Sequence, residues 1–235
     1  MSYEAVLLDL DDTLYPYAPC NEAGKRAALE AFDDLGYELD RETFDELYLH
    51  ARREAKRELG GTAASHERFI YFKRALRSHA DVHDAAAAFT LGRAYWDGYM
   101  DAMEPFDGVE STLRGVRDAG LHVVVVTNLT TRIQLEKLVR LGFDDQIDRL
   151  VTSEEVGREK PSALPFTTAL ADLDIRPSDA VMVGDNVTTD VEGGNAVGMD
   201  TVLFNADPGP DGALRPIERP DRRIDEFAEL TEVAL

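Results

Sequence analysis

Short apolar runs that end abruptly at polar residues are the feature of this sequence that most constrains its fold. Because these runs do not alternate apolar with polar residues, they are typical of parallel strands buried on both faces. Helical patterns lie between them, and alternating strands and helices predict an open parallel α/β sheet with right-handed crossovers. The apolar runs occupy 5–8, 123–126, 180–183, 201–204 and, more weakly, 149–152, and the helical patterns occupy 109–119, 131–141, 163–173 and roughly 189–197.

One long segment interrupts this alternation. Four consecutive helical patterns, at 21–35, 41–59, 65–79 and 84–103, follow the first apolar run without an intervening strand pattern. The turn-forming stretch at 104–108 marks the return to the sheet. We therefore expect an α/β core domain of residues 1–15 and 104–235 and an all-helical domain of residues 16–103 inserted after the first strand. A loop at 207–212 and a final helix near 224–230 complete the prediction.

Composition excludes several classes of protein. The 235 residues are 44% hydrophobic, which excludes wholesale disorder, and the single Cys20 excludes an intramolecular disulfide and favours a reducing compartment. A formal charge of −21 repels nucleic acid and is typical of proteins that work in molar salt, which predicts a halophilic protein. No apolar run approaches the ~20 residues needed to cross a bilayer, and the N-terminus lacks a signal-peptide pattern. We expect a cytoplasmic monomer or homodimer without membrane or nucleic-acid partners.

Polar residues that could carry chemistry follow the predicted strands. In open parallel sheets the carboxyl ends of the strands meet at one edge, where ligands bind. This edge would collect several carboxylates, a lysine and a hydroxyl group, which together suit a divalent metal and a phosphate group. The residues are Asp9, Asp11, Thr13, Thr127, Asn128, Lys160, Asp185 and Asp190.

The joint occurrence of two patterns is more specific than either pattern alone. D-x-D-x-T at 9–13 and G-D-x-x-x-x-D at 184–190 would each occur by chance roughly 0.2 times in a chain of this composition. When each must also follow four apolar residues, the pair occurs by chance on the order of once in 10⁴ sequences. Thr127-Asn128 alone could be a helix cap, and Lys160 alone could be a solvated lysine.

These segments resemble, in order, the four motifs of the haloacid dehalogenase-like hydrolase superfamily. The resemblance covers residues 1–15 and 104–204, and the helical insertion is similar to that family's C1 cap. Asp11 resembles the phosphatase pattern, because true haloacid dehalogenases lack this second aspartate, and Leu14-Tyr15-Pro16 is similar to a run in some pyrimidine 5′-nucleotidases. The matching segments are Asp9-Leu10-Asp11-Asp12-Thr13-Leu14, Val126-Thr127-Asn128, Lys160-Pro161 and Gly184-Asp185-Asn186-Val187-Thr188-Thr189-Asp190.

The resemblance implies a role for each matching residue. Asp9 would attack phosphorus and form an aspartyl-phosphate, while Asp11 would protonate the leaving group and then deprotonate water. Thr127 and Lys160 would bind the phosphate group. The backbone amides of Asp12 and Asn128 would contribute further hydrogen bonds to it.

The resemblance also implies a magnesium ion, which suits hard oxygen ligands. Asp9, the backbone carbonyl of Asp11 and Asp185 would hold it. Asp190 would orient Lys160 or a water molecule on the metal. Thr13 and Asn186 would contact and orient the site residues without binding the metal or the substrate themselves. Without a cation, an anionic substrate would meet mainly negative charge here.

The sequence thus predicts a Mg²⁺-dependent phosphatase with a Rossmann-like core, acting on phosphate monoesters of small metabolites such as a nucleotide or a sugar phosphate. A phosphomutase, a 2-haloacid dehalogenase and a non-catalytic binding module remain alternatives. Within the helical insertion, Arg68 and Lys73 could face the substrate. The aromatic residues at 69–72 and 95–96 are more typical of a packed core than of a base-stacking surface.

Overall fold

The computed structural model describes residues 3–206 and 214–235 of the chain. The loop predicted at 207–212 lies outside these described residues. The chain divides into two compact units, and each is considered by itself. The core unit comprises Met1–Pro16 and Glu104–Leu235, and the helical unit comprises Tyr17–Met103.

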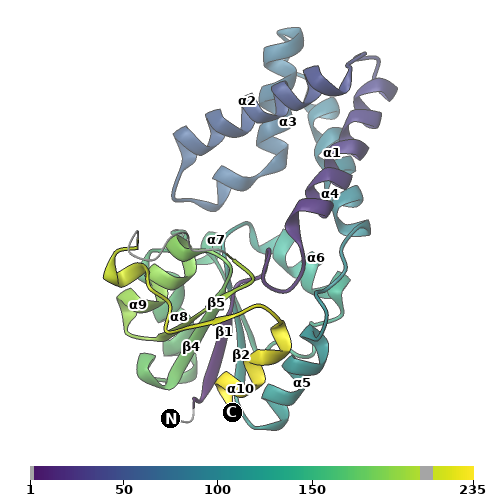
Figure 1. Ribbon diagram of the computed structural model, residues 1–235. Coiled ribbons are helices and arrows are strands. Elements are labelled where there is room, and N and C mark those ends of the chain that lie inside the picture. The colour runs from purple at the N-terminus through teal and green to yellow at the C-terminus, as the bar shows by residue number, and fades with distance from the viewer. Residues whose placement is uncertain (1–2, 207–213) are drawn as a thin grey trace. The chain divides into compact units, whose positions relative to one another are not determined.

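A six-stranded parallel sheet forms the centre of the core unit (Figure 1). The strand order is β3-β2-β1-β4-β5-β6, and each neighbouring pair is parallel. This architecture confirms the predicted α/β fold, and all five predicted strands are present. The strands span Ala5–Leu8 (β1), His122–Thr127 (β2), Arg149–Thr152 (β3), Ala180–Gly184 (β4), Asp200–Phe204 (β5) and Arg222–Ile224 (β6).

Strand β1 lies in the middle of the sheet, between β2 and β4. All four of its residues are buried, as a near-continuous apolar run predicts for a strand covered on both faces. Its last residue, Leu8, pairs with Val125 on one side and Val183 on the other. The carboxyl ends of these three strands are therefore level, and the residues that follow them share one edge of the sheet.

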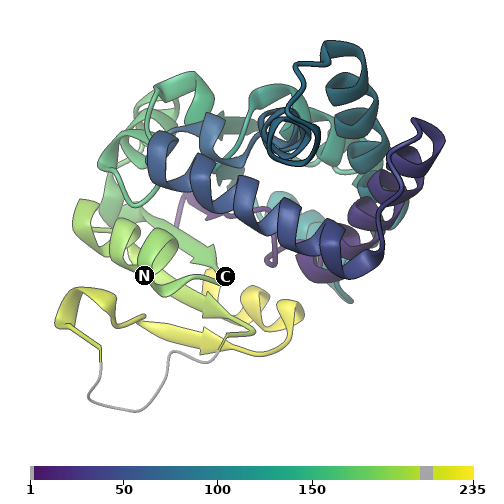
Figure 2. The ribbon, with the colours of Figure 1, turned by 90° about the horizontal axis from the view of Figure 1, so that it is seen from above.

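Helices cover both faces of the sheet (Figures 1 and 2). One face carries α8 and α9, and Phe166 of α8 belongs to the same buried cluster as Ala5 and Leu7 of β1. The predicted helices at 109–119, 131–141 and 163–173 correspond to α5, α6 and α8. The helices of the core unit span Val109–Asp118 (α5), Thr131–Leu141 (α6), Ser153–Val156 (α7), Ala163–Leu173 (α8), Gly193–Val197 (α9) and Leu230–Ala234 (α10).

Two stretches of the core unit differ from the sequence prediction. The helix expected at 189–197 is a π-helical segment, Val187–Glu192 (η3), followed by α9. The final helix expected near 224–230 begins only at Leu230, after β6 and a 3₁₀ turn at Phe227–Glu229 (η5). Strand β6 forms an edge of the sheet, and of its three residues only Ile224 is buried. It therefore contains no apolar run from which the sequence could predict a strand.

The helical unit consists of four helices and one 3₁₀ turn. Asp40 and Asp84 cap α2 and α4 by accepting hydrogen bonds from backbone amides of the first turn, as N-cap residues do. The prediction of four helices without a strand agrees with the described structure of this unit. Its elements span Tyr17–Asp34 (α1), Arg41–Leu59 (α2), Ala63–His66 (η1), Arg68–Ala80 (α3) and Ala85–Asp101 (α4). No described helix of the chain is long and apolar enough to cross a membrane.

Aromatic side chains fill the interior of the helical unit. Tyr71, Phe72, Tyr95 and Trp96 are each at most 3% exposed, so these four pack in the interior as predicted, whereas Phe69 is only half-buried. Arg68 lies among them, with its guanidinium carbon 5.0–5.5 Å from the ring centres of Tyr71, Tyr95 and Trp96. Cation–π contacts of this kind stabilise a buried guanidinium group. Lys73, by contrast, is exposed.

Candidate active site

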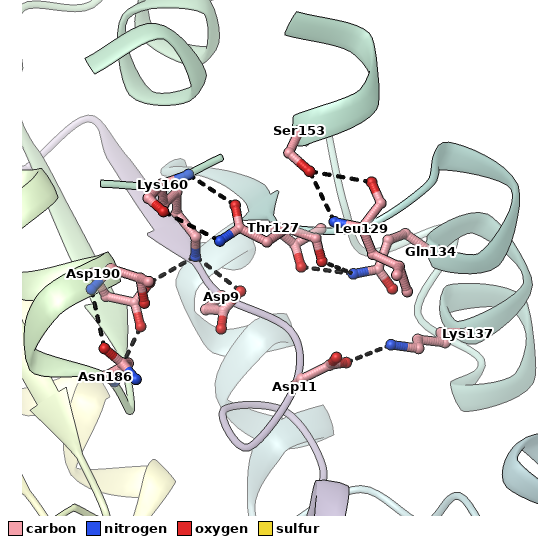
Figure 3. A network of polar contacts seen from close by, with 12 residues as sticks. Asp9, Asp11, Thr127, Leu129, Gln134, Lys137, Ser153, Lys160, Asn186 and Asp190 are labelled. Atoms are coloured by element: carbon pink, nitrogen blue, oxygen red, sulfur yellow. Dashed lines mark hydrogen bonds and ion pairs between the residues drawn. The ribbon is translucent and has the colours of Figure 1, made fainter. Parts of the chain in front are cut away.

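Residues from separate parts of the sequence meet at the carboxyl edge of the sheet (Figure 3). Asp9 follows β1, Thr127 ends β2, and Asp185 follows β4. Because β1 pairs with both β2 and β4, these three positions are neighbours in space. The structure thus brings together the strand-end residues that the sequence singled out.

Lys160 lies between two of the carboxylates. Its Nζ is 2.9 Å from Asp9 Oδ1 and 2.6 Å from Asp190 Oδ1, and its side chain is 1% exposed (Figure 3). Burial by itself lowers the pKa of Lys160, but the adjacent charges of Asp190 and Asp9 raise it above the ordinary value. Lys160 is therefore a fixed positive charge directly beside Asp9.

Burial dominates the electrostatics of Asp9. It raises the pKa of Asp9 to about 6, against the lowering influence of Lys160 and with further increases from Asp190 and Asp11. Asp9 is therefore still mostly ionised at neutral pH. A buried carboxylate with one cationic neighbour is poorly solvated, which is the condition of an available nucleophile.

Asp185 is the most perturbed carboxyl group of the cluster. Burial and repulsion from Asp9, Asp190 and Asp12 raise the pKa of Asp185 to about 8. Carboxylate oxygens of Asp9, Asp185 and Asp190 all lie within 4.8 Å of one another. A divalent cation would relieve this repulsion, and an all-oxygen donor set suits Mg²⁺, so these residues fit a magnesium ion. Both oxygens of Asp190 already accept hydrogen bonds, which leaves Asp9 and Asp185 as the better ligands.

The turn after β4 explains why a glycine precedes Asp185. A Cβ atom at Gly184 would lie 2.3 Å from Asp190 Oδ2, so a larger residue would displace the carboxylate that bonds Lys160. Asn186 caps the π-helical segment η3 by accepting hydrogen bonds from the amides of Thr188 and Thr189. The backbone N–H of Asn186 donates to Asp190 Oδ2 at 3.1 Å. Asn186 thus shapes the loop that carries Asp190.

Asn128 fastens the Lys160 segment to the end of β2. Its Oδ1 accepts a hydrogen bond of 2.8 Å from the Lys160 amide, and its Nδ2 donates to the Lys160 carbonyl at 3.3 Å. This side chain therefore fixes the backbone from which Lys160 reaches Asp9. The sequence prediction assigned only the backbone amide of Asn128 to the site.

A tight turn follows Asp9 and positions the next three predicted residues. Asp12 has φ 58°, and its amide donates to the carbonyl of Tyr15 at 2.9 Å, so this amide is not available to a phosphate in this structure. Thr13 is fully buried, and its hydroxyl has no hydrogen-bond partner among the described residues. Oδ1 of Asp11 accepts hydrogen bonds from both the Tyr15 hydroxyl and Lys137 Nζ.

Helix α6 contributes two residues that the sequence did not single out. Gln134 is fully buried and donates from Nε2 to Thr127 Oγ1 at 2.7 Å. Lys137 is 1% exposed, and its Nζ lies 2.6 Å from Asp11 Oδ1. Both point from α6 toward predicted site residues (Figure 3). A glutamine and a lysine on an otherwise amphipathic helix look like solvated positions in a sequence, and no other signal marks them.

The site combines a nucleophile candidate, a second carboxylate, a hydroxyl donor and a buried lysine. Asp9 can attack an electrophile, and Asp11 can transfer a proton. Thr127 and Lys160 can stabilise negative charge that develops on the electrophile. Carboxylates alone would repel an anion, so positive charge is needed to attract one, and Lys160 supplies one such charge. A parallel α/β core with this set of groups is suited to an enzyme of the phosphoryl-transfer class.

Comparison with known proteins identifies the family. The family model described as "haloacid dehalogenase-like hydrolase" matches residues 3–198, and the chain belongs to that family. The chain is 50% identical over 235 residues to a ribulose-1,5-bisphosphate 5-phosphatase from Halopiger xanaduensis, covering 97% of this chain and 98% of the relative. It is 35% identical to a glyceraldehyde 3-phosphate phosphatase from Methanopyrus kandleri, covering 98% and 96%. These findings confirm the prediction of a hydrolase that acts on phosphate monoesters.

Solved structures support the fold. A HAD-hydrolase YfnB from Bacillus subtilis, bound to magnesium, matches with a TM-score of 0.73 at 21% identity, covering 100% of this chain and 99% of that one. A 2-haloacid dehalogenase from Pseudomonas syringae matches with a TM-score of 0.76 at 24% identity, covering 98% and 97%. At these identities the likeness concerns the fold alone.

Proposed function

We propose that this phosphatase acts on a phosphorylated sugar, with ribulose 1,5-bisphosphate as the first candidate, through a covalent intermediate on Asp9. The observation that carries the substrate is the 50% identity to a ribulose-1,5-bisphosphate 5-phosphatase over nearly the whole of both chains. The alignment that gives this overall identity spans the helical unit, which carries none of the four motifs and where the family's cap would determine specificity. The helical unit, inserted after Pro16, is proposed to be that cap.

In the first step, an Asp9 oxygen attacks phosphorus and the bond from phosphorus to the sugar oxygen breaks. Burial keeps Asp9 poorly solvated while Lys160, 2.9 Å away, holds it in place. Asp11 transfers a proton to the departing sugar oxygen, which leaves as a neutral alcohol. Thr127 and Lys160 donate hydrogen bonds to the phosphate oxygens as charge develops on them.

In the second step, water hydrolyses the phosphorylated Asp9. Asp11 takes a proton from the water molecule as its oxygen attacks phosphorus, and the bond between phosphorus and Asp9 breaks. Inorganic phosphate leaves, and Asp9 and Asp11 return to their starting states. The fixed positions of Asp11, held by Tyr15 and Lys137, and of Lys160, held by Asn128, keep the reacting groups aligned between steps.

Asp9 and Asp185 are proposed to hold Mg²⁺, with the backbone carbonyl of Asp11 as a further oxygen ligand. When bound, the ion supplies the positive charge that lets a phosphate group approach these carboxylates. The raised pKa values of Asp9 and Asp185 arise first from burial and then from repulsion among the carboxylates, and a bound cation would offset both effects. The formal charge of −21 supports a further proposal, that the enzyme works in high salt inside the cell.

The test is a comparison of kcat/KM for phosphate release from ribulose 1,5-bisphosphate, glyceraldehyde 3-phosphate, phosphoglycolate and nucleoside monophosphates. It should be run with Mg²⁺ or EDTA, at low and high KCl, with Asp9→Asn as the inactive control. We expect the bisphosphate to react fastest and ³¹P NMR to show loss of the 5-phosphate. Faster hydrolysis of nucleoside monophosphates would refute the sugar assignment. An isomerised sugar phosphate without phosphate release would identify a phosphomutase.

A further inference from the structure

Gln134 occupies a position that its residue type rarely takes. It lies in α6 with no exposed surface, although burial of a glutamine requires hydrogen bonds to replace those made to water. Its Nε2 donates to Thr127 Oγ1 at 2.7 Å and to the backbone carbonyl of Asn128 at 3.2 Å. Gln134 therefore contacts the end of β2, where the proposed phosphate-binding hydroxyl lies.

The second of these hydrogen bonds fixes the orientation of the amide. A backbone carbonyl only accepts hydrogen bonds, so the Gln134 atom that faces the Asn128 carbonyl must be the nitrogen. A flipped amide would place two oxygens against each other at this point. The same nitrogen faces Thr127 Oγ1, so the threonine hydroxyl accepts this bond and does not donate it.

The direction of that bond decides where the hydroxyl proton of Thr127 can go. Because Gln134 donates, the proton of Thr127 is not used between these two side chains. The orientation also leaves Gln134 Oε1 buried without a hydrogen-bond partner among the described residues. An amide that only needed to satisfy itself in a core would pair both ends. The observed orientation therefore keeps the hydroxyl proton of Thr127 available, while Gln134 Oε1 stays without a hydrogen-bond partner among the described residues.

We propose that Gln134 is a positioning residue of the phosphatase reaction, which fixes Thr127 so that its hydroxyl donates toward the substrate phosphate. Gln134 acts through Thr127 and does not itself touch substrate. The inference rests on the proposed role of Thr127 in binding phosphate. It extends the site from the carboxyl edge of the sheet into the buried face of α6.

The test is a double-mutant cycle. Gln134→Leu keeps a similar volume but removes the donor, and Gln134→Glu places an acceptor that reverses the Thr127 bond. Thr127→Val removes the hydroxyl through which Gln134 would act. Gln134→Met is the second non-donating variant if the leucine variant folds poorly, and Glu136→Gln, at an exposed position of α6, is the matched control. Circular dichroism and thermal unfolding establish that each variant is folded.

We expect Gln134→Leu to lower kcat/KM about tenfold, the equivalent of one ordinary hydrogen bond, and to weaken competitive inhibition by inorganic phosphate. The kcat/KM of Gln134→Glu should be lower than that of Gln134→Leu, although the glutamate variant retains a polar side chain. Thr127→Val should lose about 10²–10³-fold, as expected for one lost donor to a transition-state oxyanion. In the Thr127→Val background, Gln134→Leu should change kcat/KM by less than about twofold.

Two results would overturn the proposal, and they are distinguishable. Full additivity of Gln134→Leu and Thr127→Val, with Thr127→Val impaired, would show that Gln134 acts by packing alone. Wild-type activity of Thr127→Val would remove the phosphate-binding role of Thr127, and the role of Gln134 with it. Neither result would affect the assignment of the chain as a phosphatase, which wild-type phosphate release tests separately.

Discussion

Replacing Asp185 by asparagine should make the metal-free protein more stable and should abolish its stabilisation by Mg²⁺. The pKa of Asp185 is about 8 in the folded protein, because of burial and repulsion from Asp9, Asp190 and Asp12, against an ordinary value of 3.8. The folded state therefore binds a proton that the unfolded state releases between about pH 4 and pH 8. Stability of the metal-free protein should fall as pH rises through that interval.

The size of the effect follows from the same two values. The difference between 3.8 and about 8 corresponds to at most about 6 kcal/mol at alkaline pH. Asp185 keeps some contact with solvent and its neighbours titrate with it, so we expect about 2–3 kcal/mol. Mg²⁺ at a hundred times its dissociation constant would stabilise the wild type by about 2.7 kcal/mol.

The assay is urea denaturation at pH 8 and pH 5 in fixed KCl, with EDTA or with Mg²⁺. In EDTA at pH 8, the free energy of unfolding of Asp185→Asn should exceed that of the wild type, and this difference should shrink at pH 5. Added Mg²⁺ should stabilise only the wild type. Asp144→Asn, which removes one exposed carboxylate, is the matched control for net charge. An Asp185→Asn variant that is no more stable than the wild type in EDTA at pH 8, and equally stabilised by Mg²⁺, would refute the reasoning.

Three further outcomes are expected. Asp9→Asn should have background turnover and no phosphorylated form. Asp11→Asn should lose about 10²–10⁴-fold in turnover and accumulate one phosphoryl group with p-nitrophenyl phosphate, as measured by acid quench and intact mass. Substantial turnover by Asp9→Asn would exclude the covalent step. Lys137→Met should reduce turnover of alkyl phosphates more than that of p-nitrophenyl phosphate, because Lys137 holds Asp11, the proposed proton donor, and a good leaving group needs no proton. An equal loss for both substrates would contradict this. The thermal midpoint should rise between about 0.1 M and about 2 M KCl, because salt screens the charge of −21, and a flat profile would remove the halophilic prediction.

The parts of the fold that the sequence predicts are those in which burial and periodicity agree. Strands β1 and β4 are buried at every residue, so their apolar runs are unbroken. Strand β6 could not be predicted, because an edge strand is held by backbone hydrogen bonds and two of its three side chains, Arg222 and Arg223, are exposed. The π-helical turn of η3 likewise depends on Asn186 and Asp190 meeting in space, which periodicity does not encode.

The candidate site shows the same division. Asp9 and Asp185 directly follow strands and Thr127 ends one, so the topology of the sheet brings these three together. Lys160 lies after α7, and only its motif marks it in the sequence. Gln134 and Lys137 lie on the buried face of α6, while Leu135 and Val139 of the same helix are 50% and 65% exposed. The buried residues of α6 also include Ile133 and Leu138, so apolar and polar side chains are mixed there. The sequence of the helix does not reveal that Gln134 and Lys137 meet polar groups at the sheet edge.

The central position of β1 also sets the order in which the enzyme is completed during synthesis. Asp9 directly follows β1, and the partners of that strand begin only at His122 and Ala180, far along the chain. The helical unit, whose packing is internal to residues 17–103, is complete before either partner exists. A nascent chain that ends before Ala180 has one edge of β1 unpaired, and such an edge invites association with other chains. The surroundings of Asp9 are therefore complete only after the segment from Ala180 has been made, and until then β1 keeps an unpaired edge.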